Sequence, residues 1–367
     1  MIVFVHLLND RSGSPRVLCS VIAALKQTDG HQCLFVGSDG NGCLEEAGIE
    51  TTKYWYKRTP YRLLTLCTYL VSQICLMLRL FLKRDIDRDA CIYVNTLLPF
   101  SAALYGKLTG RKVIYHLHEV SVNPAPLKWL LIFIARHTAR CLIYVSDFHR
   151  NCLQIPEVSS KTIHNALDAA FINVAQRNQY QYRLGGNFNV LMLASLRDYK
   201  GIPEFLELAN RFANRSDIRF HLVANDNETI IQRYFLAISV PHNVTVYSRT
   251  DDPTVFYAQA SLVLNLSRPD QCVETFGLTL LEAMVFGIPV IAPPVGGPIE
   301  LVDEGVNGFL IDSRNGDALY QQVLKLAGDE CLCLRLSAAA RNKASQFSPE
   351  AFAQALRDVI ELETSNK

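Results

Sequence analysis

The sequence predicts an α/β protein built as two domains, each around a parallel sheet. Apolar stretches of strand length alternate with helical stretches from residue 2 onward, and the alternation starts again at residue 190. Between the two series, residues 171–187 are polar and contain a Gly-Gly pair, which is typical of a linker. A chain of 367 residues is long for one hydrophobic core and sufficient for two. We expect a first domain at 1–170, a linker at 171–189, a second domain at 190–345 and a C-terminal helix at 346–367.

Charge and cysteine usage limit the classes of function. The 36 basic and 35 acidic residues argue against a protein that binds nucleic acid over its whole surface. The halves differ, because 19 basic and 13 acidic residues precede Ala170, whereas 17 basic and 22 acidic residues follow. A basic first half suits an anionic partner or a membrane surface. The 11 cysteines form no CxxC pair, which indicates a reducing cytosol and no metal site.

In the first domain, strands are expected at 2–8, 32–37, 90–95, 113–117, 141–146 and 162–166. The chain enters its first strand without a basic leader or cleavage site, which indicates a strand and not a signal peptide. The loop NDRSGSP then leads to a helix at 17–26 and lacks the GxGxxG pattern of dinucleotide binding. Gly13 in this loop would let the backbone approach a ligand, although an ordinary turn would also use a glycine.

Residues 61–84 are expected to form a helix of unusual composition. Its stretch 63–78 has no charged residue, and 16 uncharged residues are too few to span a bilayer. The basic residues beside it are Arg58, Arg62, Arg79, Lys83 and Arg84. This composition suits a helix on a membrane surface, although a core helix of an α/β domain looks similar. Residues 127–134, with Trp129, are a second such segment. We therefore expect a cytoplasmic protein with peripheral contact to the inner face of an anionic membrane through 61–84.

His118 is the candidate catalytic residue of the first domain. The carboxyl ends of parallel strands face the ligand crevice, and His116-Leu117-His118-Glu119 ends one such strand. A histidine near a strand end is more often a structural hydrogen-bonding group, so only geometry can confirm a catalytic role.

The second domain repeats the pattern of the first. Strands are expected at 190–194, 219–224, 244–247, 261–266, 287–291 and 307–311, and helices at 203–212, 254–259 and 349–361. The loop SLRDYKG follows its first strand and carries Arg197 and Lys200. These two charges would neutralise a diphosphate, and a solvated basic turn is an equally good interpretation of the loop alone.

The stretch ETFGLTLLE, residues 274–282, places two carboxylates around the start of a helix. Thr275 is expected to cap a helix that begins at residue 276 or 277, which leaves Glu274 in the loop and Glu282 about two turns along the helix. The backbone N–H groups at this start would form an anion site. Glu282 lies among apolar residues and needs a partner, for which a sugar or ribose hydroxyl is suitable. The alternative is a solvated acid before an ordinary helix.

In their order, these motifs resemble the donor-binding half of retaining glycosyltransferases of the GT-B fold, family 4 (glycosyl transferases group 1). The shared motifs are Lys200-Gly201, Asn225-Asp226, Glu274 to Glu282, PVIA, VGG and EGVNGFL. In the first domain YVNT, YHLHE, YVS and HNAL are also similar to members of this family. An ordered set is far more specific than one pair of acids. The resemblance implies two Rossmann-like domains that face each other across a cleft, with the C-terminal helix packed back toward the first domain.

The resemblance implies a role for each matched position. Glu282 would bind the ribose hydroxyls of the nucleotide, and Glu274 the hydroxyls of the donor sugar. Lys200 would pair with the diphosphate. The N–H groups that would orient the sugar or diphosphate belong to Phe276, Gly277 and Leu278.

Four further positions would complete the site. Ser248 and Arg249 would line the base pocket, Gly13 would let the first loop approach the diphosphate, and His118 would lie near the reacting carbon. Many family members have Arg five residues before the Lys, where this chain has Ser195. Arg197 lies two residues later, so its pairing with the diphosphate is the weaker assignment.

The implied reaction moves a sugar from a nucleotide-diphosphate sugar to a saccharide or lipid-linked acceptor, in bacterial surface polysaccharide or lipopolysaccharide biosynthesis. Lys200 and backbone dipoles would stabilise the leaving diphosphate, so neither a metal nor a cofactor is expected. No clear nucleophile is evident, which predicts attack on the same face. The alternatives are a nucleotide-sugar epimerase and an inactive nucleotide-sugar-binding protein. The missing GxGxxG disfavours a nicotinamide-dependent dehydrogenase.

Overall fold

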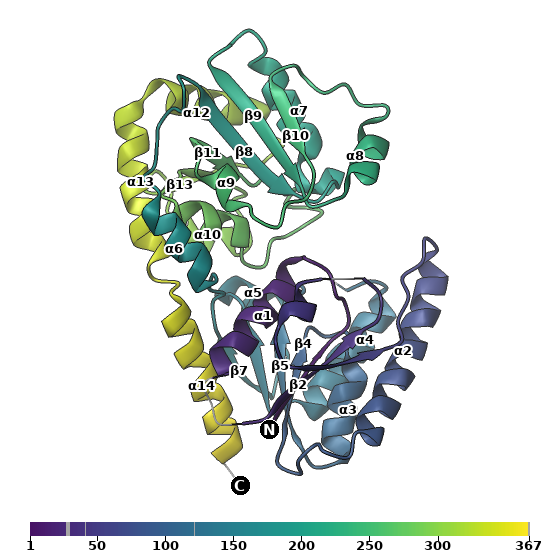
Figure 1. Cartoon of the computed structure of the whole chain (residues 1–367). Helices are drawn as coiled ribbons and strands as arrows, with labels where there is room; N and C mark the ends of the chain where they lie inside the picture. The colour runs from purple at the N-terminus through teal and green to yellow at the C-terminus, as the bar shows by residue number, and fades with distance from the viewer. Residues whose placement is uncertain (27–29, 41, 121, 366–367) are drawn as a thin grey trace. The chain divides into compact units, whose positions relative to one another are not determined.

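The computed structural model divides the chain into two compact units (Figure 1). It describes residues 1–26, 30–40, 42–120 and 122–365. The first unit comprises residues 1–166 and 349–367, and the second comprises 167–348. Each unit contains one parallel sheet, which confirms the α/β class predicted from the alternation of strands and helices.

The first unit has a seven-stranded sheet in the order β3-β2-β1-β4-β5-β6-β7. Its strands are β1 (Ile2–His6), β2 (Gln32–Gly37), β3 (Glu50–Tyr54), β4 (Cys91–Asn95), β5 (Lys112–Leu117), β6 (Cys141–Tyr144) and β7 (Ser159–Thr162). The central strands are almost entirely buried, as expected for a sheet covered on both faces. The strand expected at 162–166 is found at β7 instead. An edge strand with alternating exposure has no apolar run to mark it.

The helices of the first unit are α1 (Gly13–Leu25), η1 (Cys43–Glu46), α2 (Arg62–Leu82), α3 (Phe100–Leu108), α4 (Ala125–Thr138), α5 (Asp147–Cys152) and α14 (Pro349–Ser365). Helix α3 packs between α2 and α4 (Figure 1). The C-terminal helix α14 packs on α1, where Arg357 donates a hydrogen bond to the carbonyl of Ala24 at 3.4 Å. An ion pair of 2.8 Å joins Arg140 to Glu363. The expected return of the last helix to the first unit is therefore confirmed.

The second unit has a six-stranded sheet in the order β10-β9-β8-β11-β12-β13. Its strands are β8 (Phe188–Ala194), β9 (Ile218–Ala224), β10 (Val244–Tyr247), β11 (Leu262–Leu264), β12 (Val290–Ala292) and β13 (Gly308–Leu310). Its helices are α6 (Ala169–Arg177), η2 (Asp198–Lys200), α7 (Ile202–Arg211), α8 (Glu228–Phe235), α9 (Thr254–Tyr257), α10 (Leu278–Val285), α11 (Pro298–Leu301), α12 (Gly316–Gly328) and α13 (Glu330–Ala344).

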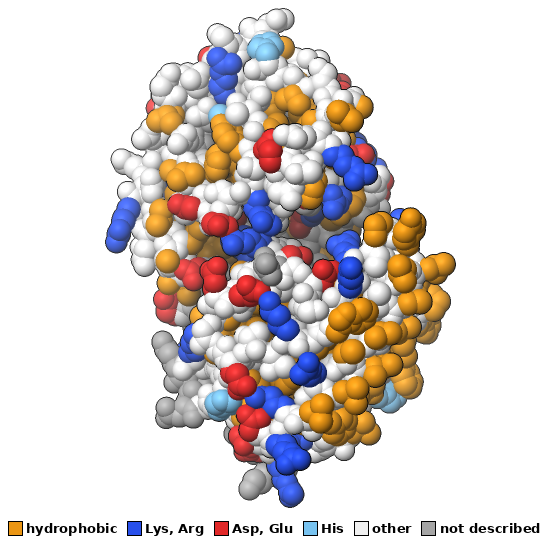
Figure 2. All heavy atoms as spheres, turned by 45° about the vertical axis from the view of Figure 1, so that its right-hand side comes forward, with side chains coloured by type: hydrophobic (Ala, Val, Ile, Leu, Met, Phe, Trp, Pro, Cys, Tyr) orange, Lys and Arg blue, Asp and Glu red, His pale blue; other side chains and the backbone are white. Residues whose placement is uncertain are grey.

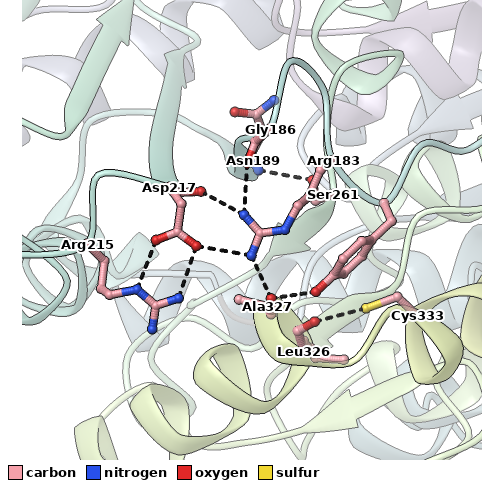
Figure 3. A network of polar contacts seen from close by, with 10 residues as sticks. Arg183, Gly186, Asn189, Arg215, Asp217, Ser261, Leu326, Ala327 and Cys333 are labelled. Carbon is pink, nitrogen blue, oxygen red and sulfur yellow. Dashed lines mark hydrogen bonds and ion pairs between the residues drawn. The ribbon is translucent and has the colours of Figure 1, made fainter.

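The structure differs from expectation at residues 171–189, which are built into the second unit and do not form a linker. Helix α6 occupies the first part, and Arg183 holds the second part at the amino end of the sheet (Figure 3). The Arg183 guanidinium donates to the carbonyl of Ala327 in α12 at 2.7 Å and lies 3.1 Å from Asp217 Oδ2, just before β9. Polar composition alone cannot reveal this, because the same polar side chains that indicate a linker make these contacts.

Candidate functional site

The predicted donor-site residues lie in loops at one edge of the second sheet. All its strands are parallel, so every strand delivers its carboxyl end to the same edge. The loops that begin there are 195–201 after β8, 225–227 after β9, 248–253 after β10, 265–277 after β11 and 293–297 after β12. Segments up to a hundred residues apart in the chain are thus brought side by side.

Lys200 and Glu274 form an ion pair between two of these loops. The Lys200 Nζ lies 2.5 Å from Glu274 Oε1, which also accepts a hydrogen bond from Ser267 Oγ at 2.8 Å. Burial alone would raise the pKa of Glu274, but the Lys200 ammonium and the hydrogen bonds from Ser267 and Asn265 outweigh it and lower that pKa. Burial disfavours the charged form of Lys200, yet the charge of Glu274 raises its pKa. Both groups are therefore charged at neutral pH.

Two glycines let the loops approach closely enough for this pair to form. Gly201 has a φ of 83°, and a Cβ there would clash with the carbonyl oxygen of Leu266. The turn after Lys200 therefore lies directly against the loop that carries Glu274. A Cβ at Gly297 would clash with the backbone of Phe276, and the Gly297 N–H donates to the Glu274 carbonyl at 2.8 Å. The VGG motif thus supports the backbone of Glu274.

Helix α10 begins at Leu278, later than expected, and Thr275 does not cap it. Gly277 is the N-cap residue with a φ of 104°, so a left-handed residue turns the chain directly into the helix. The Phe276 side chain is buried and packs edge-on against Phe347, with ring centroids 5.8 Å apart. The positive end of the helix dipole therefore lies two to four residues after Glu274, at the same edge of the sheet.

Glu282 is buried on α10, with 1% of its surface exposed. Its Oε2 accepts a hydrogen bond of 2.7 Å from the hydroxyl of Tyr257 in α9. The Tyr257 ring stacks on Phe286, with ring centroids 5.7 Å apart. The partner that an apolar helix requires for Glu282 is thus supplied in part by a tyrosine that sequence reasoning missed. A lone tyrosine in a four-residue helix carries no motif that could have identified it.

The loops after β8, β9 and β10 are joined through Asp226. Its Oδ2 accepts from the Leu196 N–H at 2.8 Å, and its carbonyl accepts from the Arg249 N–H at 3.0 Å. Ser248 and Arg249 are exposed immediately after β10. Arg197 is also exposed, and its Nη1 donates to the carbonyl of Leu196 at 2.8 Å. The structure therefore brings these three predicted residues to neighbouring loops, whereas the pairing with Glu274 is made by Lys200.

In the first unit, Asn95 links the predicted residue His118 to Ser14, which follows the predicted residue Gly13. Gly13 opens helix α1, and Asn95 is the last residue of β4. The Asn95 Nδ2 donates to the carbonyl of Ser14 at 3.2 Å and lies 3.1 Å from His6 Nδ1, while its Oδ1 lies 2.9 Å from His118 Nε2. One buried amide therefore connects the start of α1, the end of β1 and the residue after β5.

These contacts determine which nitrogen of His118 carries its proton. The carbonyl of Ser14 can only accept, so the Asn95 Nδ2 must face it and the Oδ1 must face His118. His118 Nε2 therefore donates, and its Nδ1 keeps a lone pair. Burial lowers the pKa of His118 well below its usual value, and the neighbouring imidazoles add to this effect. A neutral His118 can accept a hydrogen bond from a hydroxyl at Nδ1.

Three more histidines lie buried near this edge, and sequence reasoning did not select them. Burial lowers the pKa of His6 to about 4, that of His116 to about 3 and that of His149 to about 4. His116 Nδ1 lies 2.8 Å from the Tyr93 hydroxyl, and His149 Nε2 donates to the Glu119 carbonyl at 2.9 Å. Polar residues that end apolar strands, as in YVNT, were the signal that could have found Asn95 and His6.

Residues 175–343 match the family described as glycosyl transferases group 1. The chain is 26% identical over 201 residues to the N-acetyl-alpha-D-glucosaminyl L-malate synthase of Bacillus anthracis, covering 53% of this chain and 51% of that protein. It is 22% identical over 362 residues to an uncharacterized glycosyltransferase of Haemophilus influenzae, covering 97% and 98% of the two chains. The chain spans about half or less of the first curated relatives that it matches, down to 7% of a Melioribacter roseus sucrose synthase.

Among solved structures, the chain is similar to Anabaena HepE in complex with UDP-glucose. The TM-score is 0.76 at 21% identity, and the match covers 98% of this chain and 99% of HepE. At this identity the likeness shows the fold, and it confirms the expected GT-B architecture of two Rossmann-like units.

Proposed function

We propose that this chain is a retaining glycosyltransferase of the glycosyl transferases group 1 family, which moves a hexose from a UDP-sugar to a saccharide or lipid-linked acceptor. The observation that carries the proposal is the Lys200–Glu274 ion pair, which lies among the strand-end loops of the family-matched region. The complex of HepE with UDP-glucose makes UDP-glucose the first donor to test.

In this proposal each charged residue of the second unit binds a different part of the donor. Lys200 neutralises the diphosphate, and Glu274 beside it accepts hydrogen bonds from hydroxyls of the sugar. Glu282, with Tyr257 as its partner, binds the ribose hydroxyls. The N–H groups at the start of α10 face the diphosphate or the sugar, with Arg197 as a second cation. Ser248 and Arg249 line the base pocket.

The chemistry follows from the leaving group. The acceptor oxygen bonds to the anomeric carbon on the face from which the diphosphate departs, and the acceptor proton passes to a diphosphate oxygen. Lys200 and the backbone dipoles stabilise the negative charge that develops as the old bond breaks. From the first unit, neutral His118 accepts a hydrogen bond from a sugar hydroxyl, and Gly13 lets the first loop approach the diphosphate. We expect no metal or cofactor in this scheme.

Surface polysaccharide biosynthesis, including that of lipopolysaccharide, is the pathway class that we propose. A lipid-linked acceptor would place the enzyme at the inner face of the cytoplasmic membrane. The basic first half of the chain supports that location, because the inner leaflet is anionic.

Alanine substitutions test the assignment of the ion pair. We expect Lys200→Ala and Glu274→Ala each to lower kcat/KM for transfer from UDP-glucose by a factor of about 10² to 10³, since each removes a charge from the transition state. Arg211→Ala is the matched control, because Arg211 pairs with Asp317 at the other end of α7. Unchanged transfer in both site variants would show that the assignment is wrong. Donor turnover without any acceptor product would favour an epimerase.

A further inference from the structure

We infer that the first unit docks on an anionic lipid bilayer through the outward faces of α2 and α4. We name this the α2–α4 surface and define it by Leu63, Leu70, Ile74 and Leu78 of α2 with Trp129 and Phe133 of α4. Binding to lipid can be measured without any sugar transfer, so failure of this inference leaves the proposed enzyme activity standing. It supplies the residues for the membrane contact that the proposed function includes.

The outward face of α2 is apolar along its whole length. Leu63, Leu70, Ile74 and Leu78 recur at helical spacing, and Leu63 and Ile74 are 80% and 61% exposed. A helix of 21 residues is about 30 Å long, so the face is extended. Figure 2 shows hydrophobic side chains gathered over this flank of the first unit. A continuous apolar patch of this kind marks an interaction surface.

Helix α4 adds aromatic side chains to the same layer of helices. Helix α3 packs between α2 and α4, so all three form one layer on the sheet. Trp129 is 78% exposed and Phe133 is 60% exposed. Tryptophan prefers the boundary between lipid headgroups and hydrocarbon, because its ring is apolar and its N–H is polar.

Helix α2 is long and apolar enough to cross a membrane by length and composition, but its contacts hold it in the fold. Leu76 and Leu80 are fully buried in the core of the first unit. The Tyr69 hydroxyl donates to the carbonyl of Leu98 at 2.7 Å, and the Gln73 side chain accepts from the Ser101 hydroxyl at 3.1 Å. Only the outer face of α2 is therefore available to lipid, as in a helix that lies on a bilayer.

Charge identifies an anionic bilayer as the occupant. Residues 51–84 contain seven basic residues and no acidic residue, and two of the seven, Lys53 and Lys83, pair with Glu45 and Glu50. The sequences of α3 and α4 also lack Asp and Glu and contain Lys107, Lys128 and Arg136, of which Arg136 pairs with Glu157. Basic residues close to a membrane of anionic lipid are attracted to its negatively charged surface. A second copy of the chain fits less well, because a two-fold interface would bring the same basic surface against itself.

Binding to lipid vesicles tests the α2–α4 surface, and tryptophan fluorescence reports on the binding. Both tryptophans of the chain, Trp55 and Trp129, lie in the first unit and are exposed. We expect the full chain to co-sediment with vesicles of phosphatidylglycerol and phosphatidylcholine, with a blue shift of tryptophan emission. Pure phosphatidylcholine vesicles, or high salt, should lower the bound fraction at least tenfold.

Substitutions on the outward face separate the surface from the rest of the molecule. The double variant Ile74→Glu with Leu78→Glu should bind anionic vesicles at least tenfold more weakly and keep its thermal midpoint, because both side chains are exposed. Leu334→Glu is the matched control, since Leu334 is an exposed leucine on α13 of the second unit. No binding of the unmodified chain to anionic vesicles would overturn the inference. So would a concentration-dependent dimer that the double variant abolishes while vesicle binding is unchanged.

Discussion

Asn95, the asparagine of the YVNT motif, determines which nitrogen of His118 carries the proton. Its amide is fully buried and receives its orientation from a backbone carbonyl that can only accept. The His118 ring is consequently uncharged at neutral pH, and its Nδ1 lone pair can accept a hydrogen bond. In the proposed reaction Asn95 would act through His118, as a positioning residue.

We expect Asn95→Asp to place a negative charge beside His118 and so to raise the pKa of its imidazole. Protonated His118 has no lone pair with which to accept a hydrogen bond from the substrate. With a higher pKa, His118 would become protonated at a higher pH, so the fall of kcat/KM on the acidic side of the pH profile should begin at higher pH. In long-range ¹H–¹⁵N NMR spectra at pH 7, His118 of the unmodified chain should show a proton on Nε2 only. Asn178→Asp, which changes an amide of the second unit, is the control. An unchanged profile of kcat/KM against pH in Asn95→Asp would contradict this role.

At the scale of elements, close packing of loop backbones sets the geometry of the Lys200–Glu274 pair. The loop after β12 supports the loop after β11 through the Gly297 N–H, and the turn after η2 lies on Leu266. The side chains of Lys200 and Glu274 are therefore positioned by backbone contacts between neighbouring strand ends. This explains why the glycines of the KG and VGG motifs accompany the charged residues.

Gly297→Ala should displace the backbone of Glu274, because the added Cβ would clash with residues 275 and 276. We expect a loss of about 1–3 kcal/mol of stability and a drop of about 10² in kcat/KM. Gly328→Ala is the matched control, since nothing lies within 4 Å of its added Cβ. Differential scanning fluorimetry and donor hydrolysis measure the two effects. Full activity in Gly297→Ala would show that the loop tolerates the shift.

At the scale of the whole molecule, the two units should respond differently to acid. The first unit holds His6, His116 and His149 neutral, with pKa values of about 4, 3 and 4. An unfolded histidine has a pKa near 6.5, so between about pH 6.5 and 4 the unfolded state binds more protons. Stability of the first unit therefore falls as the pH falls through this window, by up to about 3 kcal/mol for each histidine.

In the second unit, neighbouring cations lower the pKa values of Asp217 and Glu274. The stability that these carboxylates contribute is present above their unfolded pKa values, near 4, and is lost only at lower pH. The first unit should consequently lose more stability between pH 7 and pH 5.

Urea unfolding followed by tryptophan emission isolates the first unit, which contains both tryptophans. We expect its midpoint to be lower at pH 5 than at pH 7. His31→Gln should keep this dependence, because His31 is exposed. A midpoint that does not change between pH 5 and pH 7 would contradict the account of the buried histidines.

The sequence by itself determined the fold class and predicted the loops of the candidate donor site. Apolar strands, helical spacing and punctuating glycines are local signals, and they placed Lys200, Glu274 and Glu282 on the correct elements. The same signals predicted a helix at 61–84, but they did not distinguish a helix on a membrane surface from a core helix of the domain. Composition alone also suggested a linker at 171–189, where the structure has α6 and the contacts of Arg183.

Only the tertiary structure decided which residues meet. The partners Lys200 and Glu274 are 74 positions apart, and Asn95 and His6 are 89 positions apart. Such contacts depend on the order of strands in the sheet and on the closeness of loop backbones, neither of which hydrophobic periodicity encodes. The outward direction of the apolar face of α2 was decided in the same way. An amphipathic pattern shows that a helix has two faces, whereas packing against the sheet determines which one remains exposed.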